Sequence, residues 1–214
     1  MMKLCLTLAT LAVGAVLAAS PASAQTKICT GSSLPAGTYV NVLVPSSNPS
    51  CSLGTGVIVT GNVTDQGFLN LNAGAVVDGN VMVTSGATLR MPGGTVHGSV
   101  SSNNALHIEI GSATVGTNVL LAGTTNGIII TGSIITGSLT ITGTQSGPIE
   151  VVSATVSTNV LLSGNKTSGS APNDLVAENA IGGNLTCVAN IPAPVNSGVL
   201  NTVTGNEVGQ CVGL

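Results

Sequence analysis

Aliphatic residues recur along most of this chain in three short runs per repeat, and the repeat lengthens slowly from 18 to 25 residues. Each repeat is marked by Asn or Ser followed by Val or Leu. The marks are Asn62-Val63, Asn80-Val81, Ser99-Val100, Asn118-Val119, Ser138-Leu139, Asn159-Val160 and Asn184-Leu185. A period near twenty with almost no charged or aromatic residue inside it predicts a solenoid of stacked turns.

The apolar positions align in three columns, one for each run. The first run contributes Val63, Val81, Val100, Val119, Leu139, Val160 and Leu185; the second contributes pairs such as Leu69/Leu71, Leu89/Met91, Ile108/Ile110, Ile128/Ile130 and Ile149/Val151; the third contributes Val77, Val96, Val115, Ile135, Val156 and Ile181. In each run, apolar residues alternate with more polar ones at the period of a β-strand, so the columns are expected to face the interior. Glycine, Ser, Thr and Asn between the runs predict sharp corners.

We therefore predict an all-β fold, a right-handed parallel β-helix with three short strands per turn and about six or seven turns. The right hand is favoured because the repeat grows in its corners, whereas a left-handed hexapeptide helix keeps a strict repeat of 18 residues. The Asn or Ser in the corner before the first strand predicts a polar ladder along the rod, with a structural role.

The first 24 residues match a secretory signal. A basic start at Met1-Met2-Lys3 precedes an apolar run over 4–18, and Ala22-Ser23-Ala24 has the form of a cleavage site. Cleavage before Gln25 would place the mature chain outside the cytoplasm, in the periplasm, at the cell surface or in the medium. No second long apolar stretch follows, so membrane insertion after cleavage is not expected.

Four cysteines remain after the leader, and a secreted chain is expected to oxidise them. The turns between the two groups of cysteines separate them by nearly 30 Å at about 4.8 Å per turn. Disulfides need Cα atoms within about 7 Å, so the expected bridges are Cys29–Cys51 and Cys187–Cys211. We interpret residues 25–53 and 189–214 as disulfide-locked caps that close a β-helix over 54–188.

Over residues 54–188 the pattern resembles secreted right-handed parallel β-helix proteins. The segment from Gly183 to Cys187, followed by Gly205-Asn206 and Gly209-Gln210-Cys211, is similar to an end cap of uncharacterised bacterial secreted proteins. The resemblance is one of architecture: it implies the fold and carries no specific activity and no cofactor.

Charge is scarce and slightly negative. Beyond the leader, Lys27, Arg90 and Lys166 stand against Asp65, Asp78, Glu109, Glu150, Asp174, Glu178 and Glu207. An acidic excess argues against nucleic acid and anionic lipid as partners.

A catalytic site is weakly supported. Enzymes on parallel β-helices use clustered carboxylates or a base beside bound calcium, and the strongest group here is Arg90, Glu109 and Glu150 in the outward column of the second strand. Arg90 and Glu109 are expected to form a surface ion pair. Glu109 and Glu150 are two turns apart, which places their carboxyl groups near the upper limit of the separation that inverting glycosidases use. His97 and His107 fall in different columns, so no metal site is expected.

The outward column of the first strand is unusually apolar. It reads Thr64, Met82, Ser101, Leu120, Thr140, Leu161 and Thr186. A patch of this kind predicts contact with another surface, unless the long corner over 163–182 folds across it. We therefore expect a non-enzymatic structural or interaction protein, active in adhesion, self-association or contact with matrix, cell-surface components or glycans. The alternatives are a carbohydrate-active β-helix enzyme or polysaccharide-binding protein and, less favoured because Met and Leu interrupt the threonines, an ice-binding protein.

Overall fold

The computed structural model describes residues 25–47, 50–167 and 174–214, and the predicted leader over 1–24 lies outside these ranges. The described residues form β-strands joined by short corners, with no helix. All strand pairs of the three sheets are parallel, because each strand pairs with the equivalent strand one turn away. The all-β solenoid predicted from the repeat is therefore confirmed.

We name the three sheets A, B and C. Sheet A contains β1 (Thr26–Ile28), β3 (Asn41–Val44), β6 (Val63–Asp65), β9 (Val81–Val83), β12 (Val100–Asn103), β15 (Val119–Ala122), β18 (Leu139–Thr142), β21 (Val160–Ser163), β24 (Leu185–Val188) and β26 (Glu207–Gly209). Sheet B contains β4 (Cys51–Leu53), β7 (Phe68–Leu71), β10 (Thr88–Pro92), β13 (His107–Gly111), β16 (Ile128–Thr131), β19 (Ile149–Val152) and β22 (Leu175–Ala177). Sheet C contains β2 (Gly37–Tyr39), β5 (Val57–Val59), β8 (Val76–Val77), β11 (Thr95–Val96), β14 (Thr114–Val115), β17 (Ile134–Ile135), β20 (Thr155–Val156), β23 (Ala180–Ile181) and β25 (Thr202–Val203).

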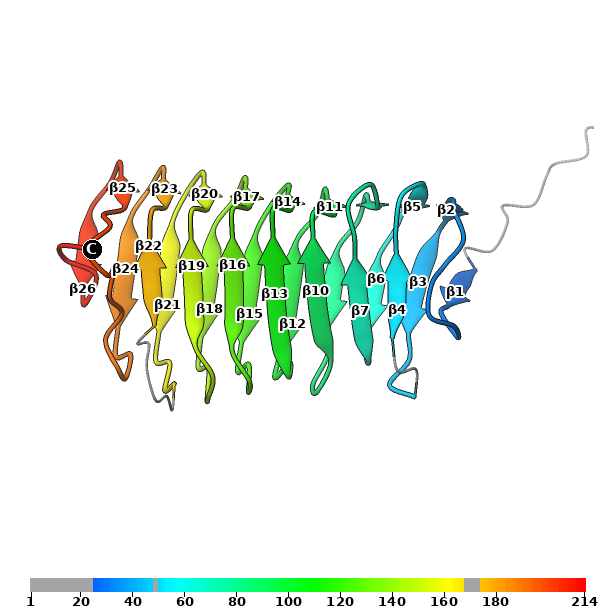
Figure 1. Cartoon of the computed structure of the whole chain (residues 1–214), viewed down its shortest axis with the longest axis horizontal. Helices are drawn as coiled ribbons and strands as arrows, with labels where there is room; N and C mark the ends of the chain where they lie inside the picture. The colour runs from blue at the N-terminus through cyan, green and yellow to red at the C-terminus, as the bar shows by residue number, and fades with distance from the viewer. Residues whose placement is uncertain (1–24, 48–49, 168–173) are drawn as a thin grey trace, which may run out of the picture.

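The winding is right-handed. In Figure 1 the chain runs up the near side in sheet B, crosses the top in sheet C and returns along the far side in sheet A while it advances toward the C-terminus. The rod has about 8 turns, so the expected six or seven was too low. The sheets continue into both segments that were interpreted as caps.

The two extra turns lie inside the ranges interpreted as caps, and one of them lacks the full sequence mark. Asn41-Val42 is a complete mark in β3, but it lies within the range assigned to the N-terminal cap. At the other end, Asn206 is followed by Glu207 where every earlier turn has Val or Leu.

The core consists of the predicted columns. Val81, Val100 and Val119 are fully buried and lie directly above one another in sheet A. Ile108 and Ile110 are fully buried in sheet B. Each further turn adds equivalent aliphatic side chains from all three sheets to one continuous core, and this burial is the main term that holds the turns together.

A polar ladder follows the corner between sheets C and A, as predicted. Where the mark is Asn, its side-chain Oδ1 accepts the backbone N–H of the next mark: the N–H of Asn80 bonds Asn62 at 2.8 Å, and that of Ser99 bonds Asn80 at 2.8 Å. Each of these amides lies at the outer corner, so the ladder uses side chains to extend the backbone pairing of sheet A around the corner.

The residue before each mark is coupled to the mark of the preceding turn. This residue is glycine where the mark of the preceding turn is Asn, and it is threonine where the mark of the preceding turn is Ser. The pairs are Asn41–Gly61, Asn62–Gly79, Asn80–Gly98, Ser99–Thr117, Asn118–Gly137, Ser138–Thr158, Asn159–Gly183 and Asn184–Gly205.

Space explains this coupling. A Cβ placed on Gly98 would lie 2.6 Å from Oδ1 of Asn80, and it would be closer still to the carbonyl oxygen of Gly79. When the mark is the shorter Ser99, the hydroxyl of Thr117 lies 2.6 Å from the Ser99 hydroxyl. A serine leaves room for the threonine side chain, and the two hydroxyls form a hydrogen bond with each other in place of the bond between an asparagine and the next backbone N–H.

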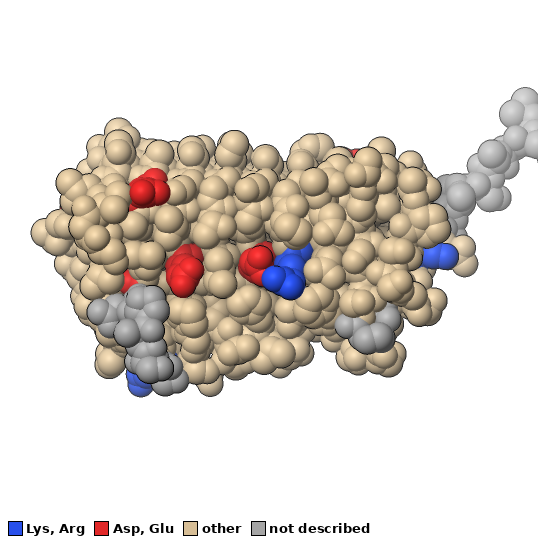
Figure 2. All heavy atoms as spheres, in the orientation of Figure 1, with Lys and Arg blue, Asp and Glu red and all other residues tan. Residues whose placement is uncertain are grey.

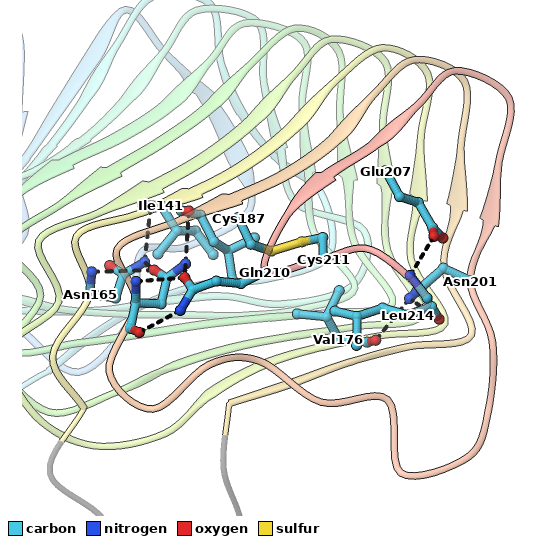
Figure 3. Close-up of a disulfide and its surroundings, with 12 residues drawn as sticks. Ile141, Asn165, Val176, Cys187, Asn201, Glu207, Gln210, Cys211 and Leu214 are labelled. Carbon is cyan, nitrogen blue, oxygen red and sulfur yellow. Dashed lines mark hydrogen bonds between the residues drawn. A yellow bond between two sulfur atoms is a disulfide. The ribbon is translucent and has the colours of Figure 1, made fainter.

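Both predicted disulfides are present. Cys29 and Cys51 have Cα atoms 6.1 Å apart, and Cys187 and Cys211 have Cα atoms 5.1 Å apart. The second bridge ties the C-terminal tail to β24 (Figure 3). Because an open turn exposes core residues and strand edges, bridges at these positions protect the two most vulnerable parts of the rod.

Buried amides also stack beneath the C-terminal end (Figure 3). Asn165 donates from Nδ2 to Oδ1 of Asn190 at 2.8 Å, and Asn190 donates from Nδ2 to Oε1 of Gln210 at 3.2 Å. Nδ2 of Asn165 also donates to the carbonyl of Ile141 at 3.2 Å. The sequence marks did not reveal this inner ladder, because its members lie outside the aligned columns.

Two carboxyl groups are buried although one oxygen atom of each accepts no hydrogen bond from the described residues. Asp65 has no exposed surface; its Oδ1 accepts the N–H of Gly67 at 3.0 Å, and its Oδ2 has no partner among the described residues. Burial raises the pKa of Asp65 from 3.8 to about 7, although the backbone N–H groups of Gly67 and Leu69 oppose the change. Burial also raises the pKa of Asp174, against the N–H of Ile149 and the hydroxyl of Thr167.

Candidate functional site

The outward column predicted for the first strand is formed by sheet A. Backbone register places Thr64 beside Met82, Met82 beside Ser101 and Ser101 beside Leu120. It continues through Thr140 and Leu161 to Thr186. Met82 and Leu120 keep 49% and 45% of their surface exposed. Long apolar side chains therefore reach solvent at the centre of the rod.

The column extends one turn further at each end than the sequence indicated. Leu43 lies in register with Thr64, and Val208 lies in register with Thr186. We call this set the outer column of sheet A: Leu43, Thr64, Met82, Ser101, Leu120, Thr140, Leu161, Thr186 and Val208. Ile28 of β1 lies in register with Leu43 beyond its N-terminal end. Leu43 was missed because its turn was assigned to the N-terminal cap, and Val208 because Asn206 is followed by Glu207 rather than Val or Leu. From Leu43 to Val208, aliphatic and hydroxyl side chains alternate from turn to turn.

The outer column carries no charge. Among the described residues of sheet A, the ionisable side chains are Lys27 on the first strand, Glu207 on the last strand and the buried Asp65. Figure 2 shows the opposite character on the sheet B side, where acidic and basic side chains lie along the middle of the rod. The molecule thus separates a charged face from an uncharged one.

Two shallow depressions of about 350 Å³ each lie at the centre of this face. One is lined by Met82, Ser101 and Leu120 together with corner residues of the outer ladder. The other lies on the opposite side of Met82 and Ser101, toward Asn103. The short side chain of Ser101 between two long ones creates a recess, because neighbouring turns are only about 4.8 Å apart.

Small uncharged residues border the outer column. On one side runs the ladder of Asn and Ser marks. On the other, Asn103, Ala122 and Thr142 lie in register at the ends of their strands, followed by Ser163 and Val188. The surface beside the column is consequently uncharged on both sides.

The long corner over 163–182 contributes strands to the other sheets. Its described parts include β22 in sheet B and β23 in sheet C. Every member of the outer column of sheet A remains exposed or half-buried. The described parts of this corner thus leave the column accessible.

The alternative site lies on sheet B. Nε of Arg90 donates to Oε2 of Glu109 at 2.7 Å, and their side chains are 51% and 28% exposed. Ile129 separates Glu109 from Glu150 in the register, so the two carboxylates are about 10 Å apart at two turns. The structure thus confirms the expected ion pair and keeps Glu150 outside it.

The two histidines lie on different sheets. His97 follows β11 of sheet C, and its Nδ1 lies 2.9 Å from Oδ1 of Asp78. His107 is in β13 of sheet B, and its Nδ1 lies 2.9 Å from the carbonyl oxygen of Asn126. Within the described ranges, no group of three or more His, Cys, Asp or Glu side chains could hold a metal ion.

No helix in the described part of the chain is long and apolar enough to cross a membrane. Comparisons of the chain with protein-family models, with curated proteins and with solved structures give no match. The function must therefore be argued from the surface of the rod itself.

Proposed function

We propose that this protein is a non-enzymatic interaction protein that works outside the cytoplasm, and that the outer column of sheet A is its contact surface. The observation that carries the proposal is the uncharged, half-exposed column itself. An exposed apolar surface that continues from turn to turn costs free energy in water and is typical of a surface that another molecule covers. The fitting partners are uncharged: a second copy, a matrix or cell-surface component, or a glycan.

Its location outside the cytoplasm rests on two independent features. The sequence over 1–24 has the organisation of a secretory signal. The two disulfides are consistent with an oxidising compartment. A rod with bridged ends and little charge also suits a structural role at a surface, where resistance to unfolding from the ends is an advantage.

We expect the substitution Leu120→Lys to reduce binding to whatever surface the protein contacts at least tenfold, which is about 1.4 kcal/mol. A charge at the centre of the column must be desolvated when a partner covers it. The chain from Gln25 onward would be screened against glycan arrays and intact cells, and the affinity of the variant would then be measured for each hit.

The matched control is Ile134→Lys. Ile134 is 51% exposed on β17 of sheet C, away from the outer column of sheet A, so this variant should bind like the wild type. If Ile134→Lys weakens binding as much as Leu120→Lys, sheet A is not the contact surface.

The enzymatic alternative is favoured only by the grouping of Arg90, Glu109 and Glu150 on sheet B. We expect the triple alanine variant to retain any polysaccharide cleavage that the wild type shows and to lose less than about 1 kcal/mol of stability. Loss of turnover by a folded triple variant would move the function to sheet B. Measuring thermal hysteresis tests the ice-binding alternative directly. Thermal hysteresis in the wild type would show that the contact surface binds ice rather than another molecule.

A further inference from the structure

The outer column of sheet A is complementary to itself. Long side chains at Leu43, Met82, Leu120 and Leu161 alternate with short ones at Thr64, Ser101, Thr140 and Thr186. If a second copy is laid face to face in the opposite direction, each of these four long side chains can meet a short one. The meeting pairs are Leu43 with Thr186, Thr64 with Leu161, Met82 with Thr140 and Ser101 with Leu120, each formed twice.

One symmetry operation produces all these pairs. It is a two-fold axis parallel to the strands of sheet A that passes midway between the turns of Ser101 and Leu120. Interfaces between identical copies are most often closed by such an axis. The opposite choice, with the two rods parallel, places Leu120 on Leu120 and Ser101 on Ser101, so that long side chains collide and short ones leave gaps.

The central recess shows where this register would seat a long side chain. The depression over Ser101 is flanked by Met82 and Leu120 and has a volume of about 350 Å³. The two-fold axis directs Leu120 of the second copy into this recess. Interdigitation of this kind is how two sheet faces pack at about 10 Å, and dry interdigitated side chains are what stabilise paired sheets.

Charge and area are also compatible with a second copy. An uncharged column faces its own duplicate without like-charge repulsion, whereas the acidic residues of sheet B would oppose each other. Eight paired turns cover roughly 40 Å along the rod and roughly 16 Å across it, or roughly 600 Å² of flat surface. A standard stable interface buries about 800 Å² per partner, so an interface of moderate strength is expected.

We propose that two copies of this protein form an antiparallel dimer through the outer column of sheet A, with Leu120 of each copy seated over Ser101 of the other. This inference rests on the proposed contact surface and specifies its partner. We expect a dissociation constant in the micromolar range, because the interface is slightly smaller than standard and lacks buried aromatic anchors.

The decisive experiment mixes two single variants. Leu120→Lys and Ser101→Asp should each weaken dimerisation of the chain from Gln25 onward at least tenfold in sedimentation equilibrium. An equal mixture should associate at least tenfold more tightly than either variant alone. In the mixed dimer, the lysine introduced in one copy faces the aspartate introduced in the other, and the second half of the interface keeps the native Leu120–Ser101 contact. A mixture no tighter than its better component would overturn the proposed register.

Disulfide trapping tests the direction of the rods. Thr64 and Leu161 are five turns apart in one chain, about 24 Å, which is well beyond the reach of about 7 Å for a disulfide. The double variant Thr64→Cys/Leu161→Cys should therefore form a covalent dimer on mild oxidation, and Thr64→Cys alone should not. Efficient crosslinking of Thr64→Cys alone would show parallel rods and contradict the proposal.

The oligomeric state of the wild type distinguishes a failure of this inference from a failure of the proposed function. A wild type that stays monomeric at about 100 µM removes the dimer. If Leu120→Lys then still abolishes binding to cells or glycans, sheet A remains the contact surface with a different partner.

Discussion

Replacing Gly98 with threonine is expected to lower the free energy of unfolding by about 3 kcal/mol or more, with a drop in melting temperature of roughly 10 °C. A Cβ at this position meets Oδ1 of Asn80 at 2.6 Å and also meets the Gly79 carbonyl. Both groups belong to the backbone and side-chain ladders of the corner, so neither can move without breaking hydrogen bonds. Urea denaturation and a thermal melt followed by circular dichroism would measure the loss.

The stronger test of the coupling between turns is a rescue. Adding Asn80→Ser to Gly98→Thr recreates the pair that occurs naturally as Ser99–Thr117, whose hydroxyls lie 2.6 Å apart. The double variant should be less destabilised than the sum of the two single changes by about 2 kcal/mol. Gly54→Thr is the control, because nothing lies within 4 Å of a Cβ at Gly54. Strict additivity in the double variant would show that the coupling is coincidental.

Stability is expected to fall as the pH rises through the range in which Asp65 ionises. Its pKa is 3.8 in the unfolded chain and about 7 in the folded one, so between these values the folded state holds the proton more tightly. The contribution of Asp65 to the free energy of unfolding is therefore highest below pH 4 and lowest above pH 7. The gap between the two pKa values corresponds to about 4 kcal/mol, of which about 3 kcal/mol falls between pH 5 and pH 8.5.

Asp65→Asn should remove most of this dependence. Its amide oxygen can still accept the N–H of Gly67, and the variant should be more stable than the wild type at pH 8.5 by about 4 kcal/mol. A smaller slope of the same sign should remain from Asp174, whose pKa is also raised by burial. Glu150→Gln on sheet B serves as the control and should keep the wild-type slope. A pH slope in Asp65→Asn equal to that of the wild type would exclude Asp65 as its source.

The core and the disulfides could be predicted from the sequence because they depend on residues one turn apart. Side chains such as Val81 and Val100 repeat at nearly constant spacing, and register alone stacks them. Once the rod is known, its length permits one pairing of the cysteines. Local spacing is therefore sufficient for the fold, with the exception of the end turns, where Glu207 replaces the expected aliphatic residue.

Other features escaped prediction because they depend on pairs or on three-dimensional environment. Asp65 has the spacing of an interior residue but the chemistry of a surface one, and only the structure shows it fully buried. The Asn–Gly and Ser–Thr coupling is visible in the sequence when the residue before each mark is compared with the preceding mark. Most of the candidate contact surface could also be predicted, but the recess over Ser101 required the relative heights of neighbouring side chains.

The corner coupling also determines how such a rod can change length during evolution. A segment that starts at a mark and ends before the next one, such as residues 80–98 or 99–117, contains both members of one coupled pair. Duplication or loss of that segment by recombination leaves every corner compatible, whereas breakpoints elsewhere can separate an asparagine from the glycine that accommodates it. Natural relatives that are longer or shorter by whole turns should therefore differ at crossover points immediately before the Asn or Ser.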